Sequence, residues 1–306
     1  MRPRLTAPIA VIAFAAVTVA AGCGSSNNEN TGTSGATLTA ASFSVQTDPS
    51  IAGQVPSDVK SSGQLTVAAD ATYAPDEFIA SDGKTVIGMD ADLAKAMADL
   101  MGLKASVSNQ TFNSIIPGLA AGKYNLGMSS FTDTKEREKT VDFVTYAQAG
   151  ESFFVKADGG PTINSIDDIC GLKVGAESGT TEADDANAQS KKCTAAGKDP
   201  VQVSVFPDEN GVNLALSSGR VDAGFADTPP ASYAVKQSNG QFELSPAPSI
   251  ANAPYGIAMA KDSGLQQPIL AAVKKLMADG TYDKIFDYWG LTTAKIDNPT
   301  INGAID

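Results

Sequence analysis

The sequence predicts an α/β protein with mainly parallel sheets, and two observations support this fold class. Short apolar stretches typical of strands alternate along the chain with stretches whose apolar residues recur at helical spacing. Such alternation is typical of parallel strands joined by crossover helices. The chain also has 306 residues, which is enough for two ordinary domains once the ends are set aside.

The first series of elements begins with a strand over residues 63–70. Asp82-Gly83-Lys84 then predicts a hairpin turn. Residues 92–101 are predicted to form a helix because their apolar side chains share one face, and Gly102 is a typical helix stop. A strand is expected around residues 105–107.

The second helix of this series is predicted to begin near Thr111, with Ile115, Ile116 and Leu119 on its apolar face. Residues 124–128 then form a strand. A second series follows, in which strands over residues 172–174, 201–206 and 220–227 alternate with helices that start near residues 180 and 211. Both series therefore have the pattern of a crossover-linked sheet.

Composition excludes several classes of function. The net charge is −12, and no cluster of Lys and Arg lies beyond the N-terminus, so no nucleic-acid partner is expected. The chain has no histidine, which excludes Ser-His-Asp and Cys-His nucleophile systems and a histidine-ligated zinc site. No glycine-rich phosphate cradle is present. We therefore predict neither a cofactor nor a metal site.

Residues 1–22 are predicted to be an export signal. Arg2 and Arg4 precede an apolar run that is too short to span a bilayer comfortably. The run ends at Cys23 in a sequence that resembles a bacterial lipobox, although Ala20 stands where leucine is usual. The resemblance implies cleavage before Cys23 and lipid on this cysteine. A soluble secreted protein with an ordinary cleavage site is the alternative.

The segment after Cys23 is predicted to be a flexible tether that extends over residues 23–59. Residues 24–39 are almost entirely Gly, Ser, Asn, Thr and Ala, which cannot bury a core. Two further cysteines remain, Cys170 and Cys193, and export makes a disulfide between them chemically possible. Two free thiols are the alternative, and metal binding is not expected from two cysteines without histidine.

A polar segment after the strand at residues 124–128 contains the candidate binding residues. Ser129, Ser130 and Thr132 offer hydroxyl and backbone donors, and Arg137 offers a planar guanidinium suited to a carboxylate. We expect a ligand site here, because ligands of parallel sheets lie at the carboxyl ends of the strands, and we expect Arg137 to bind a carboxylate group. A solvated surface arginine is the alternative.

Several motifs together resemble the extracellular solute-binding proteins of polar amino-acid ABC importers. They occur in order, at the family spacing, from about residue 63 to residue 291. The motifs are Asp70-x-x-Tyr73-x-Pro75-x-Glu77-Phe78, Gly88-x-Asp90-x-Asp92-Leu93-Ala94, Ile116-Pro117-x-Leu119-x-x-Gly122-Lys123-Tyr124, Thr134-x-x-Arg137, Gly219-Arg220-Val221-Asp222-Ala223, Pro254-Tyr255-Gly256-Ile257-Ala258 and Gly280-Thr281-Tyr282-Asp283-Lys284-Ile285 with Trp289-Gly290.

The resemblance implies the two-lobed periplasmic-binding-protein fold of type II, with two crossing strands between the lobes. Lobe 1 is expected over residues 60–147 and 249–293, lobe 2 over residues 148–248, and a polar C-terminal tail over residues 294–306. It further implies an amino-acid ligand, delivery to a membrane permease, a monomer, and a lipid-anchored position on the outer face of the cell membrane.

The resemblance also assigns roles to individual residues. Arg137, with Thr132, Thr180 and Thr181, is expected to bind the ligand carboxylate. Asp227 is expected to bind the ammonium group, assisted by the Ser130 backbone. Further positions of the expected site are Ser129 and Phe131 beside them, Tyr73 and Phe112 around the ligand side chain, and Asp70 against a cationic side chain.

Each role has a plainer alternative. Thr180 also reads as an ordinary helix N-cap, Tyr73 and Phe112 as core residues, and Asp227 as a turn residue at a strand end. Asp76 departs from the family, which usually has an aromatic residue there. This extra carboxylate favours a polar or basic ligand if it lies at the pocket wall, or else it faces water.

Two other classes of function remain open. The same fold hosts exported cyclohexadienyl dehydratases, in which a carboxylate in the cleft donates a proton. Glu177 and Asp76 are the candidates for that role here. A sensory module is the third possibility, although only a short polar tail follows Trp289. The main expectation is a receptor for amino-acid import that is not an enzyme.

Overall fold

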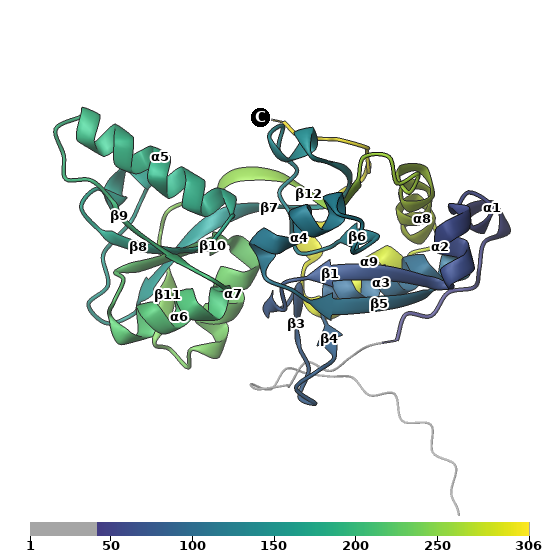
Figure 1. Cartoon of the computed structure of the whole chain (residues 1–306). Helices are drawn as coiled ribbons and strands as arrows, with labels where there is room; N and C mark the ends of the chain where they lie inside the picture. Colours follow the sequence, from purple (N-terminus) through teal and green to yellow (C-terminus); the bar gives the residue numbers. More distant parts are fainter. Residues whose placement is uncertain (1–41, 306) are drawn as a thin grey trace, which may run out of the picture. The chain divides into compact units, whose positions relative to one another are not determined.

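The computed structural model describes residues 42–305 (Figure 1). The predicted export signal, Cys23 and the part of the predicted tether up to residue 41 lie outside the described residues. Within residues 42–305, no helix is both long enough and apolar enough to cross a membrane.

Lobe 1 is built around a parallel sheet core. β1 pairs with β5 on one side and with β6 on the other, both in parallel. A small antiparallel sheet of β2, β3 and β4 forms the predicted hairpin. The bounds are β1 (Gln64–Ala69), β2 (Thr72–Tyr73), β3 (Glu77–Ile79), β4 (Val86–Ile87), α3 (Met89–Leu100), β5 (Lys104–Asn109), α4 (Phe112–Ala120) and β6 (Leu126–Gly127).

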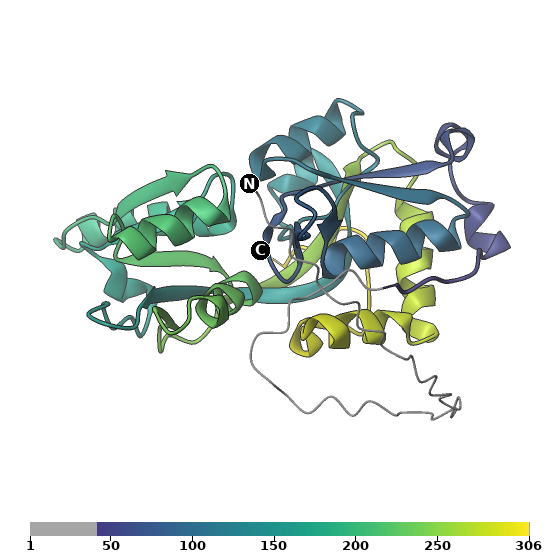
Figure 2. The same ribbon diagram turned by 90° about the horizontal axis from the view of Figure 1, so that it is seen from below.

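In the order β5-β1-β6, the crossover from β1 to β5 and the crossover from β5 back past β1 to β6 run in opposite directions across the sheet. Right-handed crossovers therefore place α3 and α4 on opposite faces of the sheet. Figure 2 shows the strands of this sheet between the two helices. The direction of winding switches at β1, so the carboxyl ends of β1 and β6 flank the crevice where such sheets bind ligands.

Lobe 2 repeats the arrangement with different strands. β8 pairs in parallel with β9 on one side and with β10 on the other, so its winding switches at β8. The carboxyl ends of β8 and β10 flank its crevice. The bounds are η2 (Ile166–Ile169), β8 (Lys173–Glu177), α5 (Thr181–Ala195), β9 (Gln202–Phe206), α6 (Glu209–Ser218), β10 (Ala223–Asp227), α7 (Thr228–Gln237) and β11 (Phe242–Leu244).

Two long antiparallel strands, β7 (Val141–Lys156) and β12 (Ile250–Ala260), join the lobes into one continuous sheet of order β5-β1-β6-β12-β7-β10-β8-β9. Gly150 lies where they meet, and a Cβ there would come within 2.3 Å of the Ser249 Oγ. The absence of a side chain thus permits this close approach. The predicted two-lobed fold with two crossing strands is confirmed.

The remaining elements cover lobe 1. The chain returns from β12 into α8 and α9, which pack on each other and on α3. Leu276 of α8 and Trp289 of α9 are buried there. The bounds are η1 (Arg137–Lys139), α8 (Gln266–Ala278), α9 (Thr281–Trp289) and η3 (Thr292–Ala294).

The prediction of a flexible tether is wrong for residues 42–59. Two short helices, α1 (Pro49–Ala52) and α2 (Ser57–Ser62), form in and just beyond this stretch. Ile51, Val55 and Val59 recur every fourth residue and are buried against lobe 1. The Asp48 N–H donates to the Leu100 carbonyl (2.9 Å), which attaches the segment to the end of α3. These three buried side chains and the hydrogen bond together attach residues 42–59 to lobe 1.

The polar C-terminal tail also attaches to lobe 1. Ile301 forms an isolated antiparallel bridge with Val144 of β7. The Thr145 N–H donates to the Thr300 carbonyl (2.9 Å), and the Gly303 N–H donates to Asp133 Oδ2 (2.7 Å). Both described ends of the chain thus belong to the same lobe.

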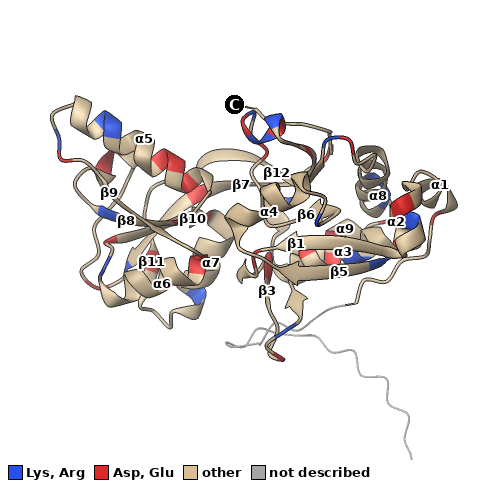
Figure 3. Ribbon diagram, in the orientation of Figure 1, with Lys and Arg blue, Asp and Glu red and all other residues tan. Residues whose placement is uncertain are grey.

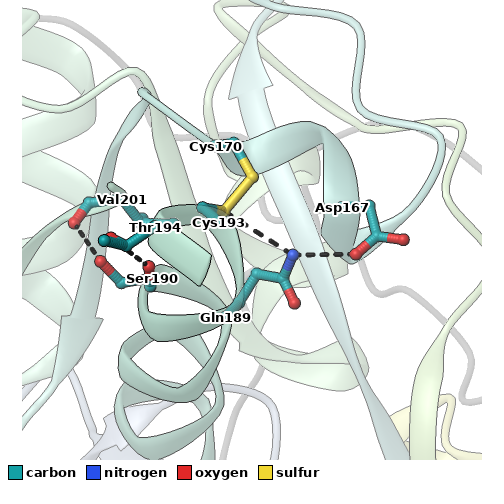
Figure 4. The surroundings of a disulfide bond; sticks show 7 residues. All are labelled: Asp167, Cys170, Gln189, Ser190, Cys193, Thr194 and Val201. Carbon is teal, nitrogen blue, oxygen red and sulfur yellow. Dashed lines mark hydrogen bonds between the residues drawn. A yellow bond between two sulfur atoms is a disulfide. The ribbon is translucent and has the colours of Figure 1, made fainter. Parts of the chain in front are cut away.

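The disulfide is the covalent cross-link of lobe 2. Cys170, just after η2, is bonded to Cys193 near the end of α5, 23 residues further along the chain (Figure 4). Gln189, one turn before Cys193, donates to Asp167 Oδ1 (2.9 Å) and strengthens the same junction. The predicted possibility of a Cys170–Cys193 bond is confirmed.

Replacing both cysteines by serine (Cys170→Ser with Cys193→Ser) should lower the free energy of unfolding by about 3 kcal/mol, because the open chain of the unfolded state gains entropy. Urea unfolding followed by circular dichroism measures this difference. The double variant should be insensitive to added dithiothreitol, whereas the parent should lose the same amount of stability with it. Equal stability of parent and variant would contradict the prediction.

Candidate functional site

The two ligand crevices of the sheets face each other across the cleft. The Arg137 Nη2 of lobe 1 donates to the Gly179 carbonyl of lobe 2 (2.9 Å). Nearby, the Asn113 Nδ2 donates to Ser178 Oγ (3.2 Å). These bonds join the segment after β6 and the start of α4 to the turn between β8 and α5. The described chain is therefore in a closed arrangement.

A narrow cavity lies between the lobes. Residues from both lobes line it, namely Tyr73, Phe112, Ser130, Thr132, Arg137, Thr180, Thr181, Glu182 and Asp227. Asp70, Asp76, Ser129 and Phe131 were also predicted to bind the ligand, but they lie outside this lining. Glu182 lines the cavity although the sequence analysis did not identify it.

Arg137 lies beside a stacked pair of aromatic rings. Its guanidinium carbon lies 5.5 Å from the centre of the Phe112 ring and 5.6 Å from that of Phe131. Its Nη1 donates to the Thr132 carbonyl (2.8 Å). Desolvation lowers the pKa of Arg137, whereas the charges of Glu182 and Asp227 act in the opposite direction. The structure thus places this arginine in the wall of the cleft and fixes the plane of its fork.

Phe131 lies behind the residues that line the cavity and packs against them. Its ring stacks on that of Phe112 with the centroids 4.4 Å apart, and Phe112 in turn lies 5.9 Å from Tyr73. The three rings form a buried row along the wall of lobe 1. Phe131 therefore supports Arg137 and Phe112 and does not itself line the cavity.

Asp227 and Glu182 are the two carboxyl groups of lobe 2 that line the cavity with Arg137. Asp227 is the last residue of β10 and is 6% exposed. Burial raises the pKa of Asp227 well above its usual value, and the charges of Glu182 and Glu151 raise it further. A carboxyl group in this environment gains strongly from a cationic partner such as an ammonium group.

The start of α5 provides the remaining donors of lobe 2. Thr180 is the N-cap, and its hydroxyl accepts from the Ala183 N–H (3.3 Å) as predicted. Thr181 approaches Thr132 of lobe 1 (3.4 Å between hydroxyl oxygens). Asp and Glu gather in the half of α5 nearer its start (Figure 3). Among them, Glu182 has its pKa raised by burial, partly offset by backbone bonding and by Arg137.

Three further carboxyl groups converge behind Tyr73. Asp70 follows β1, Glu177 ends β8 and Glu209 begins α6, and all are at most 2% exposed. We call them the carboxyl cluster. Asp70 accepts from the Phe112 N–H (3.0 Å) and from the Thr72 hydroxyl (2.8 Å).

The other two members of the carboxyl cluster have no cationic partner among residues 42–305. The Glu177 carboxyl group interacts with the Tyr73 hydroxyl and with Asp70, and within the same residues Oε1 of Glu209 has no hydrogen-bond partner. Burial, followed by the charges of Asp70 and Glu209, raises the pKa of Glu177 to about 10. Buried polar groups normally find partners. The cluster is therefore suited to a cation with several N–H donors.

Sequence analysis recognised Asp70 in the carboxyl cluster, treated Glu177 only as a possible proton donor, and missed Glu209. Glu182 and Glu209 both stand in the first turn of a helix, where an acidic residue is expected for helix stability alone. The signal that could have found them is position, since both helices start just after the carboxyl end of a strand in lobe 2.

Asp76 neither lines the cavity nor faces water, because it is completely buried. Its Oδ2 accepts from the Ser130 hydroxyl (2.9 Å), and Asp90 Oδ2 accepts from the Ser130 N–H (3.2 Å). Ser130 has φ +49°, a left-handed conformation that non-glycine residues rarely adopt. The two carboxyl groups thus hold the strained loop residue that borders the cavity. Glu77 supports Ser129 in the same way (2.7 Å).

Comparison with known proteins agrees with this architecture. Residues 65–292 match the model of the bacterial extracellular solute-binding proteins, family 3. The chain belongs to this family. Among curated proteins, it is 35% identical to the arginine-binding protein ArgT of Corynebacterium glutamicum over 255 residues, which cover 83% of each chain.

Solved structures show the same two-lobed fold. An ancestral arginine-binding protein bound to arginine has a TM-score of 0.68 and 37% identity, covering 74% of this chain and 98% of that one. The ancestral amino acid-binding protein AncCDT-1, a precursor of cyclohexadienyl dehydratase, also has a TM-score of 0.68, with 33% identity over 76% of this chain and 97% of that one. The predicted class of function, the amino-acid-binding component of an ABC importer, is confirmed.

Replacing Asp76 by asparagine should stabilise the fold, and increasingly so at higher pH. Burial raises the pKa of Asp76 well above its usual value, and the charge of Asp90 raises it further. The folded protein therefore retains a proton that the unfolded chain releases above about pH 4, and stability falls as pH rises. Asparagine keeps the acceptor for Ser130 without this cost.

The expected gain of Asp76→Asn grows by up to about 1.4 kcal/mol per pH unit above pH 4. Urea unfolding at mildly acidic and mildly alkaline pH measures it. Asp262→Asn, at an exposed position after β12, is the matched control for the loss of one carboxyl group that does not contact Ser130. A gain that is the same at both pH values would refute the role assigned to Asp76.

Proposed function

We propose that this protein captures a cationic amino acid, with arginine as the best-fitting ligand, and delivers it to the membrane permease of an ABC importer. The observation that supports this ligand class is the carboxyl cluster. Its buried carboxyl groups have no cationic partner among the described residues, and they lie beside Tyr73, which lines the same cavity as Arg137 and Asp227. The arginine-binding relatives are consistent with the same ligand.

The proposed site binds the backbone of the amino acid at one end. Arg137 pairs with the α-carboxylate, with Thr132, Thr180 and Thr181 as further donors, and Asp227 pairs with the α-ammonium. Leaving either charge unpaired in a closed cleft would be costly. The neighbouring rings and the bond to the Thr132 carbonyl hold Arg137 in place before the ligand arrives, so little conformational entropy is lost on binding.

The ligand side chain extends past Tyr73 and Phe112 toward the carboxyl cluster. A guanidinium has five N–H donors, which suits the several buried oxygens of Glu177, Glu209 and the Tyr73 hydroxyl better than the three donors of an ammonium. The stem of the side chain gains apolar contact with the rings. Arginine is therefore preferred over lysine, and both are preferred over neutral amino acids.

Closure of the lobes is part of this function. Partners for both ends of the ligand come from both lobes, so the ligand favours the closed form over the open one. We further propose that the protein acts as a monomer at the outer face of the cell membrane, anchored by lipid on Cys23. Metabolic labelling with palmitate, compared between the parent and Cys23→Ser, tests the anchor.

Calorimetric titration with all twenty common amino acids tests the ligand class. Arginine should bind most tightly, lysine next, and glutamine at least about tenfold more weakly than arginine, because its side chain brings no charge to the carboxyl cluster. Glu209→Gln should weaken arginine binding and spare glutamine binding. Preference for a neutral or acidic amino acid would contradict the proposal.

Arg137→Lys should weaken binding of every amino acid by about tenfold or more, since an ammonium cannot reproduce the two-pronged contact with the α-carboxylate. Arg220→Lys, at an exposed position after α6, is the matched control and should bind normally. The same titrations measure both variants. Unchanged affinity in Arg137→Lys would exclude Arg137 as the partner of the ligand carboxylate.

A dehydratase activity is the second candidate. It is favoured by Glu177, whose pKa of about 10 keeps it protonated at neutral pH, as a proton donor requires. The likeness to AncCDT-1 is consistent with this possibility. Incubation with prephenate and with arogenate, followed by absorbance of the aromatic products, separates the two functions. We expect no turnover, and formation of phenylpyruvate or phenylalanine would favour the enzyme.

A further inference from the structure

The carboxyl cluster exists only when the lobes are together, because its members come from both of them. Asp70 belongs to lobe 1, and Glu177 and Glu209 belong to lobe 2. The Glu209 N–H donates to the Thr72 hydroxyl of lobe 1 (3.2 Å), so the start of α6 touches the segment after β1. Opening the cleft would separate Asp70 from the other two carboxyl groups and return all three to water.

The groups around the cluster add no positive charge. The titratable groups that face it are Asp208 beside Glu209, Glu182 at the start of α5, and the Tyr73 hydroxyl from β2. No ion pair formed between residues 42–305 includes Asp70, Glu177 or Glu209. Arg137, the cation of the cavity, interacts most strongly with Glu182 and Asp227. Closure therefore concentrates negative charge.

Like charges in one buried site cannot all stay ionised without a compensating cation. Glu177 is 1% exposed, and the groups that act on its carboxyl group are Asp70, Glu209, Asp208 and the Tyr73 hydroxyl, none of which is a cation. The buried Tyr73 hydroxyl interacts with Glu177 and adds no positive charge. Something that is absent from the chain itself must supply positive charge when the lobes close.

We propose that the carboxyl cluster is a charge-sensing latch, which lets the lobes close only after it is neutralised, either by the cationic side chain of the ligand or by protons. This inference rests on the proposed function, since it takes the ligand to be a cationic amino acid. An arginine ligand neutralises the cluster directly. An uncharged ligand of the same shape closes the lobes only if the cluster binds at least one additional proton.

The consequence is a difference in protons between two complexes. Citrulline has the shape of arginine with an uncharged side chain, so the closed citrulline complex holds at least one proton that the arginine complex lacks. This difference does not depend on the protonation of the free protein, which is common to both reactions. The ratio of the two dissociation constants, citrulline over arginine, should therefore rise about tenfold per pH unit while the cluster titrates.

Calorimetric titration of the intact protein with arginine and with citrulline, from about pH 5.5 to about pH 8, tests the latch. The α-amino and α-carboxyl groups are the same in both ligands, so their own ionisation cancels from the ratio. Each titration is repeated in phosphate and in Tris, whose different heats of ionisation give the number of protons exchanged. Citrulline should take up about one proton more than arginine.

Glu177→Gln separates the latch from a general loss of binding. Removing one carboxyl group should bring the two ligands closer in affinity and reduce the pH dependence of their ratio. Glu243→Gln, at an exposed position of β11, is the matched control and should leave ratio and pH dependence unchanged. Circular dichroism of each variant shows that it is folded.

The outcomes distinguish the inference from the function on which it rests. A pH-independent ratio, or citrulline that fails to bind even at about pH 5.5, would overturn the latch while arginine binding leaves the proposed function intact. Failure of arginine and lysine to bind at any pH would instead refute the proposed function, and the latch with it.

Discussion

Each charge of a ligand that is enclosed away from water must meet an opposite charge of the protein, and this requirement explains how the cleft is built. A zwitterionic amino acid can be enclosed only where each of its charges meets an opposite one, and the fold provides such partners at two facing sheet edges. The winding of lobe 1 switches at β1 and that of lobe 2 at β8, so strand ends and helix starts face the same cavity. Arg137 and Asp227 lie there because of this topology, and so does the carboxyl cluster.

Much of the fold could be predicted from local patterns. Alternating strands and helices, glycine stops such as Gly102, and the hairpin turn at Asp82-Gly83-Lys84 all reflect short-range physics, and they appear in the structure near the predicted positions. The two crossing strands were predicted from the resemblance of the motifs to the family. The possible disulfide was recognisable because export leaves cysteine pairs free to oxidise, and Cys170 and Cys193 do form it.

What sequence reasoning missed depended on contacts between distant segments. Residues 42–59 looked like a tether because their few apolar side chains, such as Ile51, have meaning only against α3 and α8. Glu182 and Glu209 looked like ordinary first-turn acids. Asp76 was expected near the ligand or in water, yet it supports Ser130 from behind, since only the folded hairpin shows which way its side chain points.

Both described ends of the chain pack on lobe 1, so lobe 2 is in effect an insertion between two halves of its neighbour. A reporter fused to either end would move with lobe 1, so its signal would not change when the lobes open and close. A pair of fluorophores with one member on lobe 2, for example at the exposed turn after α5, would see the motion. Because both ends belong to lobe 1, a biosensor built on this protein needs at least one dye attached to lobe 2.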